Sequence, residues 1–316
     1  MIKIAGSATC AVVVAVMLTP SSAGSAFAAN NPVDLSVTTT NTSGHANDAV
    51  KISFTVTNEG SSATSGDVTL KVVTPLFVNA DANALPDGCT LLIANPDPDI
   101  PNIADCRITE KLEPQARRTI EFPLLITSRV PVAFVVGRAI ATPVPESPDR
   151  ESSLSNNDSP YGINVSESPA SGEDVTGENE INTYMWPDSP ELSPNHGRMN
   201  TLRVGNRGSV TKGDMRLTYI TPFYVNFGDG LPAGCTKILS NPDPTVPEVA
   251  TCIIPPGLDS TEVAVQLPLV MAEGVPGGFR VSFQAIFMRA PDNNTDVDKD
   301  LRNNFINAPV ILSASR

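Results

Sequence analysis

Histidine and tryptophan are nearly absent from this chain of 316 residues, which contains two histidines (His45 and His196) and a single tryptophan, Trp186. The histidines occupy non-equivalent places in polar segments, which argues against a shared catalytic base or metal site. The chain also lacks Gly-x-Ser-x-Gly, His-Glu-x-x-His and phosphate-binding glycine motifs. Because no nucleophile–base pair and no complete metal site can be assembled, we expect a protein that is not an enzyme and needs no cofactor.

Basic residues and long apolar runs are also scarce. The chain has 21 Lys and Arg against 34 Asp and Glu, a formal net charge of −13. Nucleic acids and anionic membrane surfaces would be repelled by this charge. Beyond the N-terminal region the longest apolar run, 132–136, has the length of a strand, far below the ~20 residues that span a bilayer. We therefore expect neither a nucleic-acid partner nor membrane insertion.

The N-terminal region has the order of a secretory signal peptide. Lys3 precedes an apolar run from Ala8 to Leu18, and small residues follow as far as Ala28. The apolar run is about half as long as a membrane-spanning helix. We assign 1–28 to a signal peptide and expect a secreted, extracellular protein, either free or associated with a cell surface.

Two segments of the remaining chain are nearly the same. Residues 85–106 and 231–252 each contain Leu-Pro-x-Gly-Cys, then Asn-Pro-Asp-Pro, then a second cysteine at the same spacing. Four cysteines in an exported chain favour disulfides over thiols or metal ligation. Of the three possible pairings, the duplication selects Cys89–Cys106 and Cys235–Cys252, because each copy then closes its own loop.

The duplication extends over most of the chain and indicates a repeated domain. Matching pairs lie on both sides of the cysteines, for example Asn156-Asn157 with Asn303-Asn304. Apolar and polar residues alternate over short runs such as 50–57 and 68–72, and 29 prolines disfavour long helices. With about seven strands per copy, we predict an all-β protein of two tandem Ig-like Greek-key β-sandwich domains, each with one internal disulfide.

The predicted domains comprise 29–165 and 181–316. The acidic segment 166–180, which carries Pro, Ser and Gly, is interpreted as a flexible linker. The alternative is a rigid joint between the domains, against which Met185 and Trp186 could pack.

Several motifs of each copy resemble bacterial Ig-like modules of the DUF11 / CARDB type. They are an Asn-x-Gly turn after a strand, a Leu-Pro-x-Gly stretch, the two cysteines, a leucine before the next strand, and an Asn-Asn pair. In the first copy these motifs fall at 58–60, 85–88, 89–112 and 156–157. In the second copy they fall at 206–208, 231–234, 235–258 and 303–304. The chain departs from the family's pattern after the leucine, at 113–114 and 259–260, and in the opening strand at 181–186. The resemblance implies an Ig-like fold and a role as spacer, stalk or adhesive module, usually without enzymatic activity, and it supplies no site residues.

The Asn-Pro-Asp-Pro loops are candidate binding loops. Asn95, Asp97, Asn241 and Asp243 lie within the predicted disulfide rings, where two prolines would lower the entropy cost of binding. The alternative is a turn in which Asn and Asp bond their own backbone.

Two further sets of residues are candidates for ligand binding. In the acidic loop 292–300, oxygen ligands at alternate positions suggest a Ca²⁺ site, although the loop lacks the Gly and the bidentate Glu of an EF-hand; these residues are Asp292, Asn294, Asp296 and Asp298. A solvated hairpin loop is the alternative. Aromatic rings concentrated in the second copy, notably Trp186, Tyr224 and Phe227, suggest glycan stacking, with core or inter-domain packing as the alternative.

The first functional hypothesis is therefore a secreted, non-enzymatic structural or protein-interaction protein, whose partner is a protein or a cell-surface component. The second is an extracellular carbohydrate- or cell-wall-binding protein that uses the aromatic residues of the second domain. Exposure of Trp186 and Tyr224 distinguishes the two, since glycan stacking needs open rings.

Overall fold

The computed structural model describes residues 31–98, 100–127, 130, 134–166, 179–194, 196–273, 275, 281–290 and 295–313. The predicted signal peptide and most of the predicted linker lie outside these ranges. No helix in the described ranges is long and apolar enough to span a membrane.

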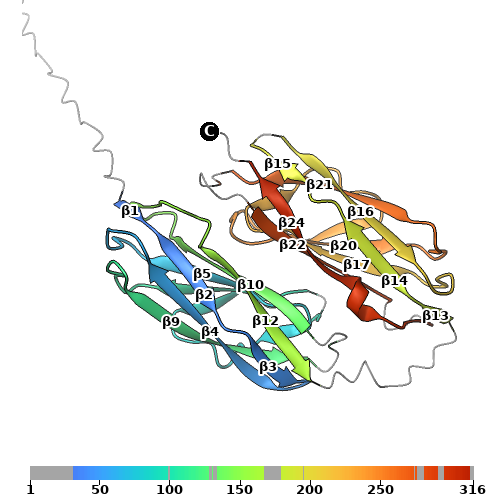
Figure 1. The fold of residues 1–316 in the computed structure, drawn as a ribbon, viewed down its shortest axis with the longest axis horizontal. Helices are drawn as coiled ribbons and strands as arrows, with labels where there is room; N and C mark the ends of the chain where they lie inside the picture. The colour runs from blue at the N-terminus through green and yellow to red at the C-terminus, as the bar shows by residue number, and fades with distance from the viewer. Residues whose placement is uncertain are drawn as a thin grey trace, which may run out of the picture.

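The first domain is a sandwich of two sheets with a short two-stranded extension (Figure 1). The six-stranded sheet has the order β3-β12-β10-β5-β8-β7, the four-stranded sheet β2-β4-β9-β6, and the extension pairs β1 with β11. Their bounds are β1 Asn31–Val33, β2 Leu35–Thr39, β3 Thr42–His45, β4 Ala49–Asn58, β5 Val68–Val73, β6 Val78–Ala80, β7 Cys89–Ile93, β8 Ile103–Ile108, β9 Arg117–Ile126, β10 Phe134–Pro143, β11 Asp149–Glu151 and β12 Asp158–Ser166.

The second domain repeats this topology strand for strand. Its six-stranded sheet has the order β15-β24-β22-β17-β20-β19, its four-stranded sheet β14-β16-β21-β18, and β13 pairs with β23. The bounds are β13 Asn179–Ile181, β14 Thr183–Pro187, β15 Glu191–Leu192, β16 Arg198–Asn206, β17 Met215–Ile220, β18 Val225–Phe227, β19 Cys235–Leu239, β20 Val249–Ile254, β21 Val263–Met271, β22 Val281–Arg289, β23 Asp296–Asp298, the 3-10 helix η2 Leu301–Asn304 and β24 Phe305–Leu312.

The predicted fold class is confirmed: the protein is all-β, with two sandwich units that each contain one disulfide. The number of strands was underestimated, because β1, β11, β13, β15 and β23 have only two or three residues each. Strands that short cannot show a period-2 pattern, which needs at least four residues.

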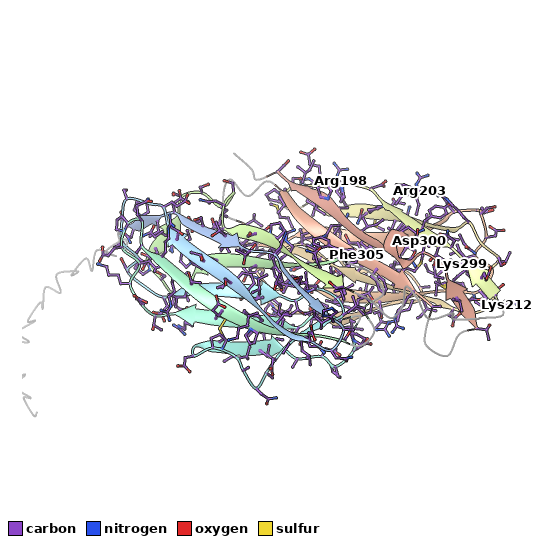
Figure 2. The ribbon with its side chains drawn as sticks, turned by 60° about the horizontal axis from the view of Figure 1, so that its bottom comes forward. Arg198, Arg203, Lys212, Lys299, Asp300 and Phe305 are labelled. Atoms are coloured by element: carbon purple, nitrogen blue, oxygen red, sulfur yellow. A yellow bond between two sulfur atoms is a disulfide. The ribbon has the colours of Figure 1, made fainter. Side chains whose placement is uncertain are left out.

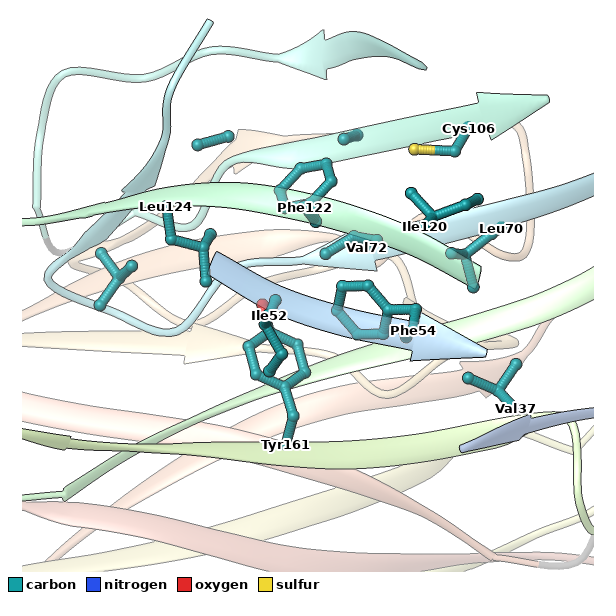
Figure 3. Packing of buried hydrophobic residues seen from close by; sticks show 14 of the residues in the cluster. Val37, Ile52, Phe54, Leu70, Val72, Cys106, Ile120, Phe122, Leu124 and Tyr161 are labelled. Atoms are coloured by element: carbon teal, nitrogen blue, oxygen red, sulfur yellow. The ribbon is translucent and has the colours of Figure 1, made fainter. Parts of the chain in front are cut away.

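The core of the first domain lies between its two sheets. Along β4 the side chains of Ile52, Phe54 and Val56 are buried, while the residues between them point away from the core, as the alternation predicted. Phe54 meets Phe122 and Tyr161 edge-on, with ring centroids 6.2 and 5.2 Å apart (Figure 3). Full burial of such a side chain contributes about 1.5–3 kcal/mol, which makes this aromatic group a main source of the domain's stability.

Both predicted disulfides are present and join neighbouring strands. Cys89 on β7 lies directly opposite Cys106 on β8, and Cys235 on β19 lies opposite Cys252 on β20. Because β7 and β19 are edge strands of the six-stranded sheets, each disulfide fixes an edge strand and the loop that follows it.

The two six-stranded sheets face each other, and their outer surfaces are packed together (Figure 1). The buried cluster of the second domain includes Val73, Ile103 and Ile140 of the first, and that of the first includes Ile220 and Phe287 of the second. The sequence interpretation was a flexible linker between independent domains, with a rigid joint as the alternative; in the structure the two domains are in contact. Met185 and Trp186, considered for the joint, lie elsewhere, on β14 of the four-stranded sheet.

Candidate functional site

The two Asn-Pro-Asp-Pro loops have the turn geometry that their composition suggests. The side-chain oxygen of Asn95 accepts a hydrogen bond of 2.9 Å from the amide of Asp97, and Asn241 accepts an equal bond from the amide of Asp243. These Asx turns use each asparagine to shape its own loop.

Each loop supports an aromatic residue with a left-handed backbone. Phe77 and Tyr224 occupy equivalent places and have φ of 64° and 62°. Such conformations are uncommon for bulky residues and cost on the order of 1–3 kcal/mol. The amides of Phe77 and Tyr224 donate bonds of 2.7 Å to the carbonyls of Pro98 and Pro244, at the ends of the two loops. Both rings are buried, so the loops hold them at the domain interface.

The aspartates of the two loops reach the opposite domain in a reciprocal way. Asp97 of the first domain is 2.5 Å from the guanidinium of Arg216 on β17, and Asp243 of the second is 3.2 Å from Lys71 Nζ on β5. Equivalent loops therefore contact equivalent strands across the interface. This is the pattern of an isologous, two-fold interface, formed here within one chain.

Aromatic contacts also cross the interface. Phe77 packs edge-on against Phe287, with ring centroids 5.0 Å apart, and the guanidinium of Arg138 lies 5.7 Å from the ring centre of Phe223. A small cavity of about 30 Å³ between the domains is lined by equivalent residues, among them Val73 with Ile220. The interface thus combines aromatic packing with charged contacts.

The Lys71 ammonium group is almost fully enclosed at this interface. Its side chain is 5% exposed and lies 3.8 Å from Asp105 as well as 3.2 Å from Asp243. Burial acts to raise the pKa of Asp243, but hydrogen bonds from Thr245 and the charge of Lys71 outweigh it and lower that pKa. Asp243 is therefore held as the carboxylate that Lys71 requires.

A larger cavity of about 320 Å³ lies beside this ion pair and is lined by Lys71, Glu151, Tyr224 and Asp243, together with several prolines. Burial raises the pKa of Glu151 to about 7. Its carboxyl oxygens accept hydrogen bonds of 3.0 Å from the amide of Leu35 and 2.9 Å from Asn157. The carboxyl group of Glu151 is thus bonded to the fold on both oxygens.

A buried aspartate ties together the end of each domain; sequence reasoning missed Asp149 and interpreted Asp296 as a Ca²⁺ ligand. Asp149 accepts bonds from Asn31 (2.7 Å) and from the amides of Ser65 and Gly66 (2.9 and 3.0 Å). Asp296 makes the same set of bonds, with Asn179, Lys212 and Gly213. The sequence contains one signal of this feature. Each Asn-Asn pair is preceded, at the same distance in both copies, by an Asp-x-Glu or Asp-x-Asp triplet that begins with this aspartate.

Asp296 is one of the predicted Ca²⁺ ligands, and its carboxylate is bonded within the fold. Asp298, its neighbour on β23, accepts bonds from the amide of Thr183 and the side chain of Asn304, both 2.9 Å. Asp292 and Asn294 lie outside the described residues. Within the described ranges no group of three or more His, Cys, Asp or Glu side chains is placed to hold a metal ion.

The structure separates the three aromatic residues considered for glycan stacking. Tyr224 is 3% exposed and Phe227 4%, so neither ring is open to a ligand, whereas Trp186 is 57% exposed. Tyr224 is buried at the domain interface and Phe227 packs beside Tyr219, with ring centroids 5.5 Å apart. His45 and His196 are exposed and lie in different domains.

No protein-family model and no curated protein matches the chain. Among solved structures, the CARDB domain of a Pyrococcus furiosus protein, in complex with di-metal ions, is 12% identical, covers 44% of this chain and 90% of its own, and has a TM-score of 0.28. CaCohA2 from Clostridium acetobutylicum is 13% identical over 43% of this chain and 92% of its own, with a TM-score of 0.27. Red sea bream transglutaminase is 8% identical over 89% of this chain and 31% of its own, with a TM-score of 0.23. At these identities the matches concern the fold alone.

The fold and its bonds define the class of the protein: two β-sandwich domains in tandem, each closed by one disulfide and packed against the other. The disulfides indicate an oxidising environment.

Proposed function

We propose that the protein is an exported, non-enzymatic interaction or spacer protein whose two domains act as one unit. The observation that carries the proposal is the reciprocal interface, in which Asp97 contacts Arg216 and Asp243 contacts Lys71. Interfaces between domains are usually polar and allow relative motion. Buried aromatic rings and an enclosed ammonium group resist such motion, which suits a protein that presents its surfaces at a fixed spacing.

The use of the buried polar groups supports a non-enzymatic role. The carboxyl of Glu151 is bonded to Leu35 and Asn157, and the carboxylate of Asp149 to three groups of the fold. Catalytic acids and bases need a lone pair or a proton directed at substrate. The bonds of Glu151 and Asp149 to the fold are those that a structural role requires.

Export is supported by the predicted signal peptide together with the two disulfides. We propose that the partner is a protein or another component of a cell surface. Tyr224 and Phe227 are buried and therefore not open to a glycan. Of the three aromatic residues, the wall- or glycan-binding alternative now depends on Trp186.

The experiment adds labelled mature protein (29–316) to cells of the producing organism. We expect saturable retention that disappears when the cells are first treated with protease, and recovery of the native protein outside the cytoplasm with both disulfides formed. Retention abolished by glycan hydrolases but not by protease would favour wall binding. Absence of retention, or cytoplasmic protein with reduced cysteines, would contradict the proposal.

A further inference from the structure

The outer faces of the two four-stranded sheets differ at corresponding positions. In the first domain Ser36 lies opposite Thr57 and Thr38 opposite Thr55; in the second Tyr184 lies opposite Gly205 and Trp186 opposite Arg203. Two further exchanges accompany these: Lys51 corresponds to Met199, since both lie opposite a proline, and Glu59 corresponds to Arg207 after the matching asparagines. The second domain therefore has aromatic, thioether and guanidinium groups where the first has polar residues, of which Ser36 and Thr57 are buried and Thr38 is exposed.

Four of these residues, Tyr184, Trp186, Gly205 and Arg207, form one structure. The ring of Tyr184 lies across Gly205, where an added Cβ would be 2.5 Å from the ring carbon Cζ, so any larger residue would displace the ring. The guanidinium of Arg207 lies 4.6 Å from the centre of the Tyr184 ring, and the ring of Trp186 is 6.5 Å away. In the first domain the same place holds a hydrogen bond of 2.9 Å from Ser36 to Glu59. A glycine that accommodates the ring and an arginine that stacks on it indicate coordinated change.

The composition of this patch is that of a protein-binding surface. We define the Trp186 patch as Tyr184, Trp186, Met199, Arg203 and Arg207. Trp, Tyr, Met and Arg are enriched at protein interfaces, while Lys, Glu and Ser, which the first domain carries there, are depleted. Trp186 is 57% and Met199 51% exposed. A flexible thioether suits a protein partner better than a glycan, which stacks on flat rings.

The patch is also basic, although the protein as a whole carries a net charge of −13. Arg198 and Arg203 lie along one margin of the second domain (Figure 2). Arg203 has Glu262 at 3.9 Å, but both side chains are solvent-exposed, so this pair is weak. Because Arg203 and Arg207 are its charged groups, the patch itself is complementary to an acidic group.

We propose that the Trp186 patch binds an acidic segment of a partner protein, which places an apolar side chain against Trp186 and carboxylates on the arginines. This inference rests on the proposed function. It names the surface through which the protein binds its partner and the chemistry of that partner. Bidentate arginine–carboxylate pairs and a central tryptophan are typical of binding hot spots.

The test selects peptides from a random display library on the mature protein. The control is an exchange variant with the residues of the first domain: Y184S, W186T, R203T, G205T and R207E. Selected peptides should be rich in Asp and Glu, contain an apolar anchor, and fail to bind the exchange variant. Because Trp186 is the single tryptophan, its fluorescence should shift to the blue on binding. R207E, which keeps this reporter, should weaken binding roughly tenfold or more, whereas K51M in the first domain should not change it.

Several results would overturn the inference: selected peptides that are neutral or basic, peptides that bind the exchange variant equally well, or no saturable fluorescence change. A saturable shift with polygalacturonate but not with acidic peptides would assign the patch to an acidic glycan instead. Failure of the inference is distinguishable from failure of the proposed function. If cells retain the exchange variant as well as the wild-type protein, the function stands and the Trp186 patch is not its surface.

Discussion

The facing surfaces of the two domains have kept matching contacts, whereas the outer surfaces of their four-stranded sheets have diverged. Asp97 and Asp243 occupy equivalent loops and reach equivalent strands of the opposite domain. On the outer faces, Ser36 and Thr38 correspond to Tyr184 and Trp186. The repeated loops, the most distinctive feature of the sequence, thus serve to join the domains. The diverged face is the better candidate for contact with another molecule.

The largest expected effect comes from the aromatic rings at the interface. Phe77→Ala removes a ring that is 3% exposed and packs against Phe287. We expect the free energy of unfolding to fall by about 3 kcal/mol or more, measured by urea denaturation. Phe134→Ala provides the control, since that ring is 45% exposed. Equal effects of the two substitutions would contradict the importance of the interface.

The second prediction tests whether the two domains are energetically equivalent at their disulfides. Replacing Cys89 and Cys106 by serine should cost about 3 kcal/mol, and the same change at Cys235 and Cys252 should cost a similar amount, because the rings have equal length. Unfolding curves of the two double variants provide the measurement. A large difference between them would show that the domains depend on their edge strands to different degrees.

The third prediction concerns pH. Burial raises the pKa of Glu151 from 4.5 to about 7, so the folded protein binds a proton more tightly than the unfolded chain does. The corresponding stability is fully present below about pH 4.5 and is lost as pH rises through 7. Glu151→Gln should remove this decline when stability is measured between pH 4.5 and 7. Glu113→Gln, at an exposed site, should retain it; a decline that persists in Glu151→Gln would assign it to another group.

The smallest effect is expected on the outer face. Trp186→Thr alters a side chain that is 57% exposed and should change the free energy of unfolding by no more than about 0.5 kcal/mol. Thermal melting of this variant beside Thr38→Ala measures the effect. A loss of several kcal/mol would mean that Trp186 has a structural role, and the contrast between the outer and facing surfaces would weaken.

The sequence predicted the longer strands and both disulfides because their signals are local or repeated. The alternation at 50–57 falls within β4, and equal cysteine spacing in two copies identified both bonds. The domain interface was not predictable in the same way. Lys71 alternates with core residues, which correctly directs it away from the core of its own domain. The pattern cannot reveal that the second domain covers that outward face. Because of this cover, every residue of β5 is buried.

The candidate site was predicted only in part for a similar reason. Asp97 and Asp243 were predicted as candidate binding residues because their loops are repeated. Their partners, Arg216 and Lys71, lie far from them along the chain, so the sequence did not indicate these contacts. Asp149 was missed and Asp296 was interpreted as a Ca²⁺ ligand, because the repeated triplets do not reveal that these aspartates are buried and bonded to backbone amides.

Small-angle X-ray scattering of the mature protein tests the central claim most directly, that the reciprocal interface makes the two domains one unit. We expect a single compact distribution of distances that matches side-by-side packing and does not change between low and high salt, because the buried rings hold the interface in addition to its ion pairs. A broad distribution extending to the length of two separated domains would contradict the account.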